Sequence, residues 1–594
     1  MAHLRKLKNR EGRIYYYIAQ SYRIKSVTKQ RTLSYIGRHD QMLATGDTDP
    51  ELTAKETVAN WNNTNGLTPI TKTITTDTKA SSYLLNFGYQ ILSRIYDELG
   101  IPTVIGQYAK AHRFKFNPDQ VLKLLVIGRM LEPASKSRTI ADFQETLTGA
   151  WALSQNDMDR SLDHFGTKEL KTDIQLAIHK NISKLTNRTA TLVFYDVTNY
   201  YFESDLGDPD ILMDGSSTLL NKTLQKKQGI SPSGVVERGM RKRGASKEYR
   251  RDPIVQLGLF MDSNGIPIAY QIFPGNESDP LTYQPAIEQV KQQFGLERIV
   301  TVADKAMNSE SNVSASKKRG DGWLFSQKVR GKKGVPKDIQ EFALARSDWE
   351  FNSDMSIAKK SMIRTREIGK GANTTQVQEK VLVTWRRSYA VREKIRRDGA
   401  LDYAAALTNP EKFRRTMRRG GKKYLKMTLK DTKTGEVVEA CPQLDVDHEL
   451  ADFDAQFDGM NVIATSEINM SDDEIMRSYG QLHKIEDCFR VTKTTLKTRP
   501  VFVWTKPHIE AHFLTCFIAL VILRFLQFRL RNQYSPERIV EALRSLTGQN
   551  WAGGYWEIFA NDDAKGIMNE LGCNLSNKLQ SVELVHHLDR RIML

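Results

Sequence analysis

The stretch ATLVFYDVTNYYF, residues 190–202, decides the fold. Its run of β-branched and aromatic residues predicts a buried strand that ends at Asp196. A second apolar run, RIVTVAD at 298–304, predicts another strand, and this one stops at Asp304. Strands that end on the same edge of a sheet bring together residues that are far apart in sequence. We therefore expect Asp196 and Asp304 to be neighbours.

The segments around these two strands extend the pattern. PIVQLGLFMD at 253–262 turns through SNG into IPIAYQIF at 266–273, which predicts a hairpin. LTYQPAIEQVKQQFG at 281–295 predicts a helix, and GWLFSQKV at 322–329 predicts a further strand. Together these elements indicate an α/β domain built on a mixed sheet.

The composition points to a nucleic-acid partner. The 594 residues include 87 Lys and Arg against 70 Asp and Glu, a net charge of +17 with a pI near 9.4. Such a charge suggests a polyanionic partner, and nucleic acid is the leading candidate, although a basic protein without such a partner can have the same composition. The four cysteines are scattered without a CxxC spacing, which favours a reducing, cytoplasmic setting over a zinc finger.

Several classes of protein are not supported by the sequence. The opening MAHLRKLKNREG has no apolar core, so no signal peptide is predicted. FLTCFIALVIL at 513–523 is too short to span a bilayer and predicts a buried helix, so no membrane partner is expected. No GxxxxGK[ST] phosphate loop is present, so the sequence does not support a use of ATP.

Basic clusters recur between residues 330 and 460, as RGKKG, WRRSYAVREKIRR and KFRRTMRRGGKKYLK. One interpretation is a DNA-facing segment with phosphate contacts, and the other is a solvated basic surface. The first is favoured because Trp385, Tyr389 and Tyr424 lie among the cations, where they could stack on bases. The candidate DNA-binding cations in and beside these clusters are Lys328, Arg330, Arg386 and Arg387.

A later stretch, YGQLHKIEDCFRVTK at 479–493, predicts a helix. A seven-residue step in an α-helix is almost two turns, so Tyr479, Glu486 and Lys493 would lie along one stripe. An amphipathic helix with solvated charges gives the same pattern.

Asp196, Asp304 and Glu486 are candidate metal ligands. Three carboxylates that meet would repel one another, and hard divalent cations with oxygen ligands resolve that conflict. Two Mg²⁺ ions about 3.5–4 Å apart are a recurring arrangement in phosphodiester chemistry. For either aspartate alone, a turn former at the end of a strand is an equally good interpretation.

In combination these motifs resemble a known family. VFYDVTNYYF, VTVADKAMNS, the basic segment and the later helix, in this order, are similar to the DDE transposases of bacterial insertion sequences. The narrower resemblance is to the insertion-sequence-four superfamily and covers roughly residues 185 to 530. It implies an RNase H-like catalytic domain with a β-rich insertion before the glutamate helix.

The resemblance also implies roles for individual residues. Asp196, Asp304 and Glu486 would be catalytic and would bind two Mg²⁺ ions, with Mn²⁺ as a possible substitute. Tyr479 and Lys493 would hold the end of the mobile element.

Two positions are less settled. Trp385 would replace a flipped base, or else would be a core residue of the insertion. Leu482 stands where the family has an arginine, and our hypothesis is that Arg490 or Lys493 makes that phosphate contact instead.

The expected organisation of the chain follows from these patterns. A chain of this length is expected to form roughly two to four domains. The predicted parts are a small basic β module, 1–46; a linker, 47–80; a helical region that could bind end DNA or brace the next domain, 81–186; the first part of the catalytic domain, 187–329; the β-rich basic insertion, 330–460; the second part of the catalytic domain, 461–533; and a C-terminal helical region, a candidate dimerisation surface, 534–594.

The function implied by the resemblance is cut-and-paste transposition of an insertion sequence, with phosphodiester hydrolysis and strand transfer at the element's ends. Its partners would be double-stranded DNA, as terminal inverted repeats and target, and a second copy of the chain in a synaptic complex at the bacterial nucleoid. Two alternatives stay open: an RNase H-like nuclease that cleaves without joining, and a DNA-binding regulator derived from a transposase.

Overall fold

The computed structural model describes two compact units, Met1–Lys79 and Ala80–Leu594. The described residues are 2–9, 11–24, 27–65, 84–148, 151–186, 188, 191–212, 236–331, 334–369, 374–407, 429–430, 437–438, 448–551, 555–573 and 579–581. Each unit is described by itself below.

The first unit is a three-stranded antiparallel sheet packed on helices. Its elements are β1 (Ala2–Lys8), β2 (Ile14–Ile24), β3 (Val27–Arg38), α1 (His39–Ala44) and α2 (Pro50–Asn65). The segment predicted as a linker, 47–80, therefore contains a helix. The helix was not predicted because the segment is mostly polar. Its buried residues Ala54 and Val58 lie one helical turn apart.

A helical layer opens the second unit. Its helices are α3 (Gly88–Glu98), α4 (Ile101–Ala111), α5 (Pro118–Leu131), α6 (Lys136–Ala141), α7 (Gln155–Phe165) and α8 (Lys168–Thr186). The sequence predicted a helical region here, and the start of α5 shows why: Asn117 caps the helix by accepting a hydrogen bond from the Asp119 N–H.

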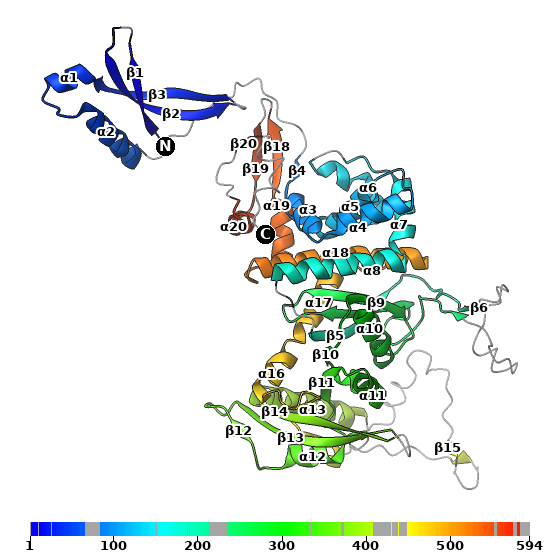
Figure 1. Cartoon of the computed structure of the whole chain (residues 1–594). Helices are drawn as coiled ribbons and strands as arrows, with labels where there is room; N and C mark the ends of the chain where they lie inside the picture. Colours follow the sequence, from blue (N-terminus) through cyan, green and yellow to red (C-terminus); the bar gives the residue numbers. More distant parts are fainter. Residues whose placement is uncertain are drawn as a thin grey trace. The chain divides into compact units, whose positions relative to one another are not determined.

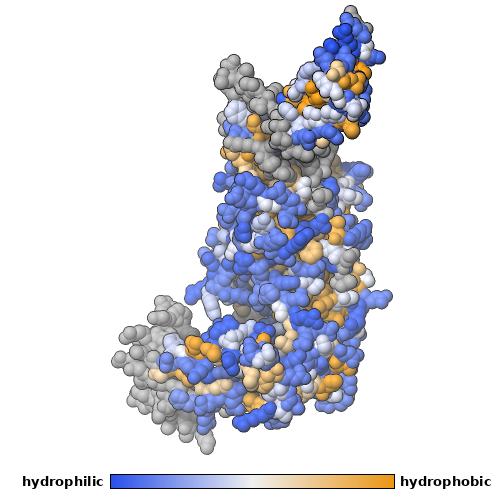
Figure 2. Space-filling view, turned by 90° about the vertical axis from the view of Figure 1, so that its left-hand side faces the viewer, coloured by the Kyte–Doolittle hydropathy of each residue, from blue (hydrophilic) through white to orange (hydrophobic). Residues whose placement is uncertain are grey.

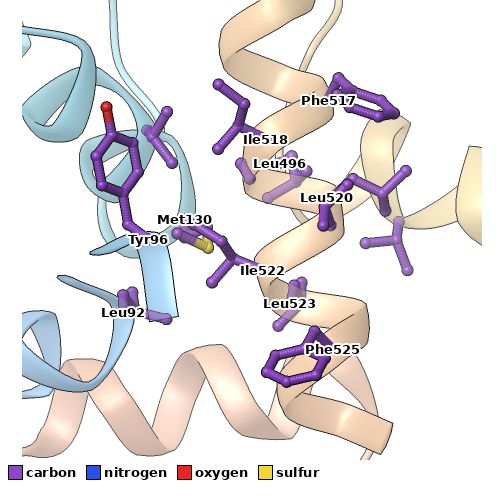
Figure 3. Close-up of a cluster of buried hydrophobic side chains, with 14 of the residues drawn as sticks. Leu92, Tyr96, Met130, Leu496, Phe517, Ile518, Leu520, Ile522, Leu523 and Phe525 are labelled. Atoms are coloured by element: carbon purple, nitrogen blue, oxygen red, sulfur yellow. The ribbon is translucent and has the colours of Figure 1, made fainter. Parts of the chain in front are cut away.

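A long apolar helix, α18 (Lys506–Arg529), runs between this layer and the sheet (Figure 1). Met130 of the helical layer points toward Ile522 of α18, and Leu92 and Tyr96 belong to the same buried cluster (Figure 3). Among the described residues α18 is the one helix long and apolar enough to cross a membrane, and 94% of its most apolar window is buried inside the protein. The predicted buried helix at 513–523 is confirmed.

A nine-stranded mixed sheet forms the centre of the second unit. Its order is β12-β13-β14-β17-β11-β10-β5-β8-β9. The strands are β5 (Leu192–Tyr201), β8 (Ile254–Met261), β9 (Pro267–Pro274), β10 (Val300–Ala303), β11 (Gly322–Gln327), β12 (Glu350–Phe351), β13 (Ile357–Ile368), β14 (Thr375–Arg386) and β17 (Met460–Thr465). Strands β5, β10 and β11 are parallel, and the other pairs are antiparallel. The predicted mixed α/β architecture and the β8–β9 hairpin are confirmed.

The two faces of the sheet bury different clusters. Helices α10 (Asp279–Phe294) and α11 (Glu310–Lys318) cover one face, where Tyr195 and Phe325 are buried. Helices α17 (His483–Thr494) and α18 cover the other, where Phe194 and Val302 are buried. Because side chains alternate along a strand, Asp196 and Asp304 lie on the same face as Phe194 and Val302.

The long strands of the basic segment belong to the central sheet, and β15 (Leu429–Lys430) and β16 (Val437–Val438) pair as a separate two-stranded sheet. Strands β13 and β14 pair with β17 and so continue the central sheet. The segment also contains the helices α12 (Lys337–Leu344), α13 (Arg387–Leu407) and α15 (His448–Ala455), so it is less β-rich than predicted. The third basic cluster, 412–426, and Tyr424 within it lie outside the described residues.

The C-terminal region, predicted as helical, combines helices with a small sheet. It contains α19 (Pro536–Ser545), α20 (Asp562–Glu570), β18 (Thr547–Trp551), β19 (Tyr555–Phe559) and β20 (Leu579–Ser581). Strand β4 (Leu85–Asn86), distant in sequence, pairs with β18, and Phe87 contacts Trp556 edge-to-face at 5.1 Å between ring centroids. The aromatic residues of β18 and β19 favour strands once this partner is present.

Candidate functional site

The site begins with two aspartates on adjacent strands. Strands β5 and β10 pair in parallel with Phe194 opposite Val302, and the same register continued brings Asp196 opposite Asp304. The prediction that β5 ends at Asp196 was wrong, because β8 pairs with β5 as far as Tyr201. Asp196 is at the edge for another reason: β10, its neighbour, ends at Ala303.

Asp304 is held by the backbone and by a neighbouring hydroxyl. It caps a short 3-10 helix, where its Oδ1 accepts hydrogen bonds from the Lys305 N–H at 2.7 Å and from Ser326 Oγ at 3.0 Å. Ser326 lies on β11, one strand farther along the same row. Ser326 also lies close enough to Tyr479 to lower the pKa of its phenol.

The predicted single helix around Glu486 is two helices. Tyr479 lies in the last turn of α16 (Asp472–Gly480), and Glu486 and Lys493 lie on α17. Gln481 and Leu482 join the two helices. Their N–H groups donate to the carbonyls of the residues three positions earlier, so this short connection has the tighter winding of a 3-10 turn. Ser471 caps α16 in a capping box with Glu474.

Tyr479 still lies within electrostatic range of all three carboxylates. Its pKa is raised, mainly because it is largely buried, and further by the negative charges of Asp304, Glu486 and Asp196. The structure therefore brings together Asp196, Asp304, Glu486 and Tyr479, from β5, β10, α17 and α16.

Asp196 is partly buried, whereas Asp304 and Glu486 are exposed. The pKa of Asp196 is raised to about 6, mainly by burial and in smaller part by the negative charges of Asp279 and Asp304. Lys247 opposes this shift through its positive charge, and the Val197 N–H opposes it by donating a 2.7 Å hydrogen bond to Asp196 Oδ1. At neutral pH this carboxyl is ionised although its surroundings disfavour the charged form, so its ionisation lowers the stability of the folded protein.

Lys493 of α17 lies near Asp196 of β5. Its Nζ donates a 2.8 Å hydrogen bond to Thr198 Oγ1, two residues along β5 from Asp196. The pKa of Lys493 is lowered to about 8, mainly by burial and also by the charge of Lys247, while the charge of Asp196 opposes the shift. Glu248 Oε1 lies 3.9 Å from Lys493 Nζ and also pairs with Arg499.

Two residues of the site were not found from the sequence. Asp279, at the start of α10, has a raised pKa because of burial and the charge of Asp304, with Lys247 opposing the shift. Lys247 donates a 2.6 Å hydrogen bond to the Val197 carbonyl. Lys247 comes from a basic loop and Asp279 from a helix start, and neither pattern distinguishes them from surface residues.

The side chain of Arg490 is paired with acidic residues outside the candidate site. Its guanidinium is 2.7 Å from Asp487 and 2.6 Å from Glu537, a residue of α19. Leu482, at the family's arginine position, packs partly buried against the main core. Of the two residues considered as substitutes for that arginine, Lys493 is the one placed beside Asp196.

The candidates in the basic segment lie apart from the carboxylates. Trp385 on β14 is four strands from Asp196, about 19 Å at the usual strand spacing. Its indole N–H donates to the Asp458 carbonyl at 3.1 Å, which agrees with the alternative of a core residue. Arg330 is paired with Glu393 and Asp458.

The remaining basic candidates surround an exposed tyrosine or flank a strand. Arg386 and Arg392 lie 5.6 and 4.7 Å from the centre of the Tyr389 ring, which is 42% exposed. Arg387 begins α13, and Lys328 directly follows β11.

The donor chemistry of the site suits hard divalent cations. Its carboxylates supply oxygen ligands, and the raised pKa of Asp196 reflects negative charge that a cation would relieve. Within the part of the chain that the structure describes, no three His, Cys, Asp or Glu side chains stand close enough together to hold an ion as they are placed. Binding of a cation would therefore require these carboxylates to move closer to one another.

The first unit matches a known domain. Residues 4–59 match the IS1634 family transposase, N-terminal domain. The chain thus carries the N-terminal domain of an insertion-sequence transposase. This match rests on the β module and α2, and not on the carboxylates of the second unit. No curated protein matches the sequence.

Several solved transposase complexes are similar to the chain at low identity. A piggyBac transposase synaptic complex with hairpin DNA is 7% identical, with a TM-score of 0.34 over 87% of this chain and 88% of that one. The Mos1 transposase paired-end complex with left transposon end is 12% identical, with a TM-score of 0.13 over 48% of this chain and 69% of that one. At such scores these likenesses do not by themselves establish a shared fold.

Proposed function

We propose that the chain is a DDE transposase that cuts an insertion sequence from DNA and joins its ends to a target. The observation that carries the proposal is the position of Asp196 opposite Asp304 on the parallel strands β5 and β10, with Glu486 on α17, a helix that contacts β5. The match of residues 4–59 to an insertion-sequence transposase domain supports it independently. An RNase H-like fold of the central strands is part of the same proposal.

Asp196, Asp304 and Glu486 would hold the cations, with Asp279 nearby as a further carboxylate. Two Mg²⁺ ions, or Mn²⁺ in their place, would supply activation of the attacking oxygen and stabilisation of the leaving oxygen. Ser326 fixes Asp304 through its 3.0 Å hydrogen bond, which limits the rotamers from which that carboxylate can act.

The cationic residues of the site would hold the scissile phosphate. Lys493 is oriented by Thr198, and Lys247 is oriented by the Val197 carbonyl. Both ammonium groups lie within electrostatic range of Asp196, so they can bind a phosphate next to the carboxylates. Tyr479, which lies near Ser326 and Asp304, would contact the end of the element.

Two ends must be joined in one assembly, so we propose that the chain acts as a homodimer on double-stranded DNA. The terminal inverted repeats and the target would be its two DNA substrates, and no ATP is required. The net charge of +17 supports DNA as the partner.

The proposal is tested by cleavage and strand transfer on labelled DNA that carries the element's end, in Mg²⁺. Glu486→Gln should lose both activities and keep DNA binding. Glu541→Gln, the same change at an exposed position of α19, should keep both activities. Equal activity of Glu486→Gln and wild type would refute the carboxylate assignment. Cleavage without joining by the wild type would instead indicate the nuclease, and metal-independent binding without cleavage would indicate the regulator.

A further inference from the structure

The sheet of the first unit has one covered face and one open face. On the covered face Tyr16 is fully buried, and its hydroxyl lies 3.0 Å from His39 Nδ1 of α1. Lys6, opposite Tyr16 on β1, pairs with Glu51 of α2 at 2.6 Å. Because side chains alternate along a strand, the neighbours of Tyr16 point to the opposite face.

That open face carries three tyrosines in one group. Tyr35 lies 5.2 Å from Tyr17 and 6.5 Å from Tyr15 between ring centroids, and it is 51% exposed. Arg5 is opposite Tyr17 and Leu7, 40% exposed, is opposite Tyr15 on β1. This set, Arg5, Leu7, Tyr15, Tyr17 and Tyr35, is called the tyrosine face below.

Charge in this unit is divided between sheet and helices. The sheet segment, residues 2–38, has ten Lys and Arg and a single acidic residue, Glu11. The helical segment, residues 39–65, has one Lys and five Asp and Glu. A polyanion is therefore attracted to the sheet side and repelled from the helix side.

We propose that the tyrosine face is the surface by which the first unit binds double-stranded DNA. Three strands span about 10 Å at the usual spacing, and the major groove is about 12 Å wide. Antiparallel strands are a known means of reading that groove. Arg5 and the phenol groups supply hydrogen-bond donors toward base edges and phosphates.

This inference shares the DNA partner with the proposed function but does not use the carboxylates. Its failure and the failure of the catalytic proposal are therefore distinguishable. Asp304→Asn should abolish cleavage and leave DNA affinity unchanged, whereas changes on the tyrosine face should lower the affinity first.

The test measures binding of the full-length protein to a labelled duplex of the element's terminal repeat, in EDTA, and to an unrelated duplex of equal length. Tyr17→Ala with Tyr35→Ala should weaken binding to the terminal repeat by about ten-fold or more. The matched control carries Leu52→Ala and Lys55→Gln on exposed positions of α2, and its affinity should stay within about two-fold of wild type.

A second variant tests the proposal even if the double tyrosine variant does not fold. Arg5→Gln should weaken binding to the duplex and reduce the dependence of log affinity on log salt by about one. Equal affinities for the tyrosine variant, the Arg5 variant and the α2 control would overturn the proposal. It would also fall if the tyrosine variant lost self-association while DNA affinity stayed at the wild-type value, because the face would then be a protein interface.

Discussion

Carboxylates in two settings lie on the central sheet: Glu379 and Asp262 are buried and paired, whereas Asp196 is partly buried and Asp304 is exposed. Glu379 on β14 is fully buried and lies 2.6 Å from Arg364 and 3.7 Å from Arg366. Asp262, next to β8, is 2.6 Å from the buried guanidinium of Arg188. These carboxylates each have a guanidinium of their own.

The carboxylates of the candidate site do not share this balance. Asp196 has Asp279 and Asp304 as negative neighbours, and burial holds its pKa at about 6. Lys247 and Lys493 are nearby, but their hydrogen bonds go to the Val197 carbonyl and to Thr198. Paired carboxylates stabilise a fold, whereas unbalanced carboxylates on the same sheet indicate a place where a cation is needed.

The largest effect is expected from removal of a carboxylate at the site. Asp304→Asn should lower DNA cleavage by at least about 10³-fold, because stabilisation of charge in the transition state by bound cations is worth several kcal/mol. The measurement is single-turnover cleavage of labelled end DNA in Mg²⁺. Glu379→Gln, on the same sheet but in a paired position, should retain the cleavage rate of its folded fraction. An equal loss of cleavage in both variants would contradict the distinction between site carboxylates and paired carboxylates.

Removal of one partner of a buried ion pair should lower the stability of the fold rather than the rate of DNA cleavage. Asp262→Asn should lower the free energy of unfolding by about 3–5 kcal/mol, because it leaves the Arg188 charge buried without its partner. Chemical denaturation followed by fluorescence measures this. Asp563→Asn removes an exposed pair with Arg538, and its cost should be much smaller because water screens both charges. Similar costs for the two variants would contradict the distinction between buried and exposed pairs.

Asp196→Asn should stabilise the metal-free protein while it abolishes activity. The folded pKa of about 6 lies above the ordinary value of 3.8, so wild-type stability falls as pH rises through about 6. At pH 8 the difference is at most about 3 kcal/mol, and about 1–2 kcal/mol once partial exposure of Asp196 is considered.

The check is the melting temperature in EDTA at pH 5 and pH 8. The gain from Asp196→Asn should be present at pH 8 and small at pH 5, because the wild-type carboxyl is then largely protonated. Added Mg²⁺ should stabilise the wild type and leave the variant unchanged. A variant that melts below wild type at pH 8 in EDTA would show that Asp196 is not under electrostatic strain.

The smallest effect is expected at Lys493. With a pKa of about 8, its ammonium group loses charge as pH rises through 8, so wild-type affinity for end DNA should fall across that range. Lys493→Met should remove this pH dependence and reduce the salt slope by about one. Lys565→Met, at an exposed position of α20, serves as the control. A pH profile unchanged in Lys493→Met would place that lysine outside the DNA contact.

The sequence was informative where a local pattern determines the structure. The apolar runs at 190–202 and 298–304 form β5 and β10, and their parallel pairing brings Asp196 opposite Asp304. The seven-residue spacing of Tyr479, Glu486 and Lys493 predicted one stripe on one helix, whereas Tyr479 lies on α16 and the other two on α17. The caps at Asn117 and Ser471 are local, because each interaction is confined to a few residues.

The features that the sequence did not indicate depend on distant partners. Strand β5 continues past Asp196 because β8 is beside it, and the strands after α19 form because β4 pairs with β18. Arg490 and Arg330 were predicted to contact DNA, but each has acidic partners elsewhere in the fold. Such choices depend on which side chains tertiary packing brings within reach.

The central claim is that Asp196, Asp304 and Glu486 form one cation site. The most direct measurement is Mn²⁺ binding by the full-length protein on end DNA, followed by the paramagnetic resonance of free Mn²⁺. The account predicts that wild type binds two ions and that Asp196→Asn with Asp304→Asn binds none at the same concentration. Equal Mn²⁺ binding by wild type and the double variant would contradict it.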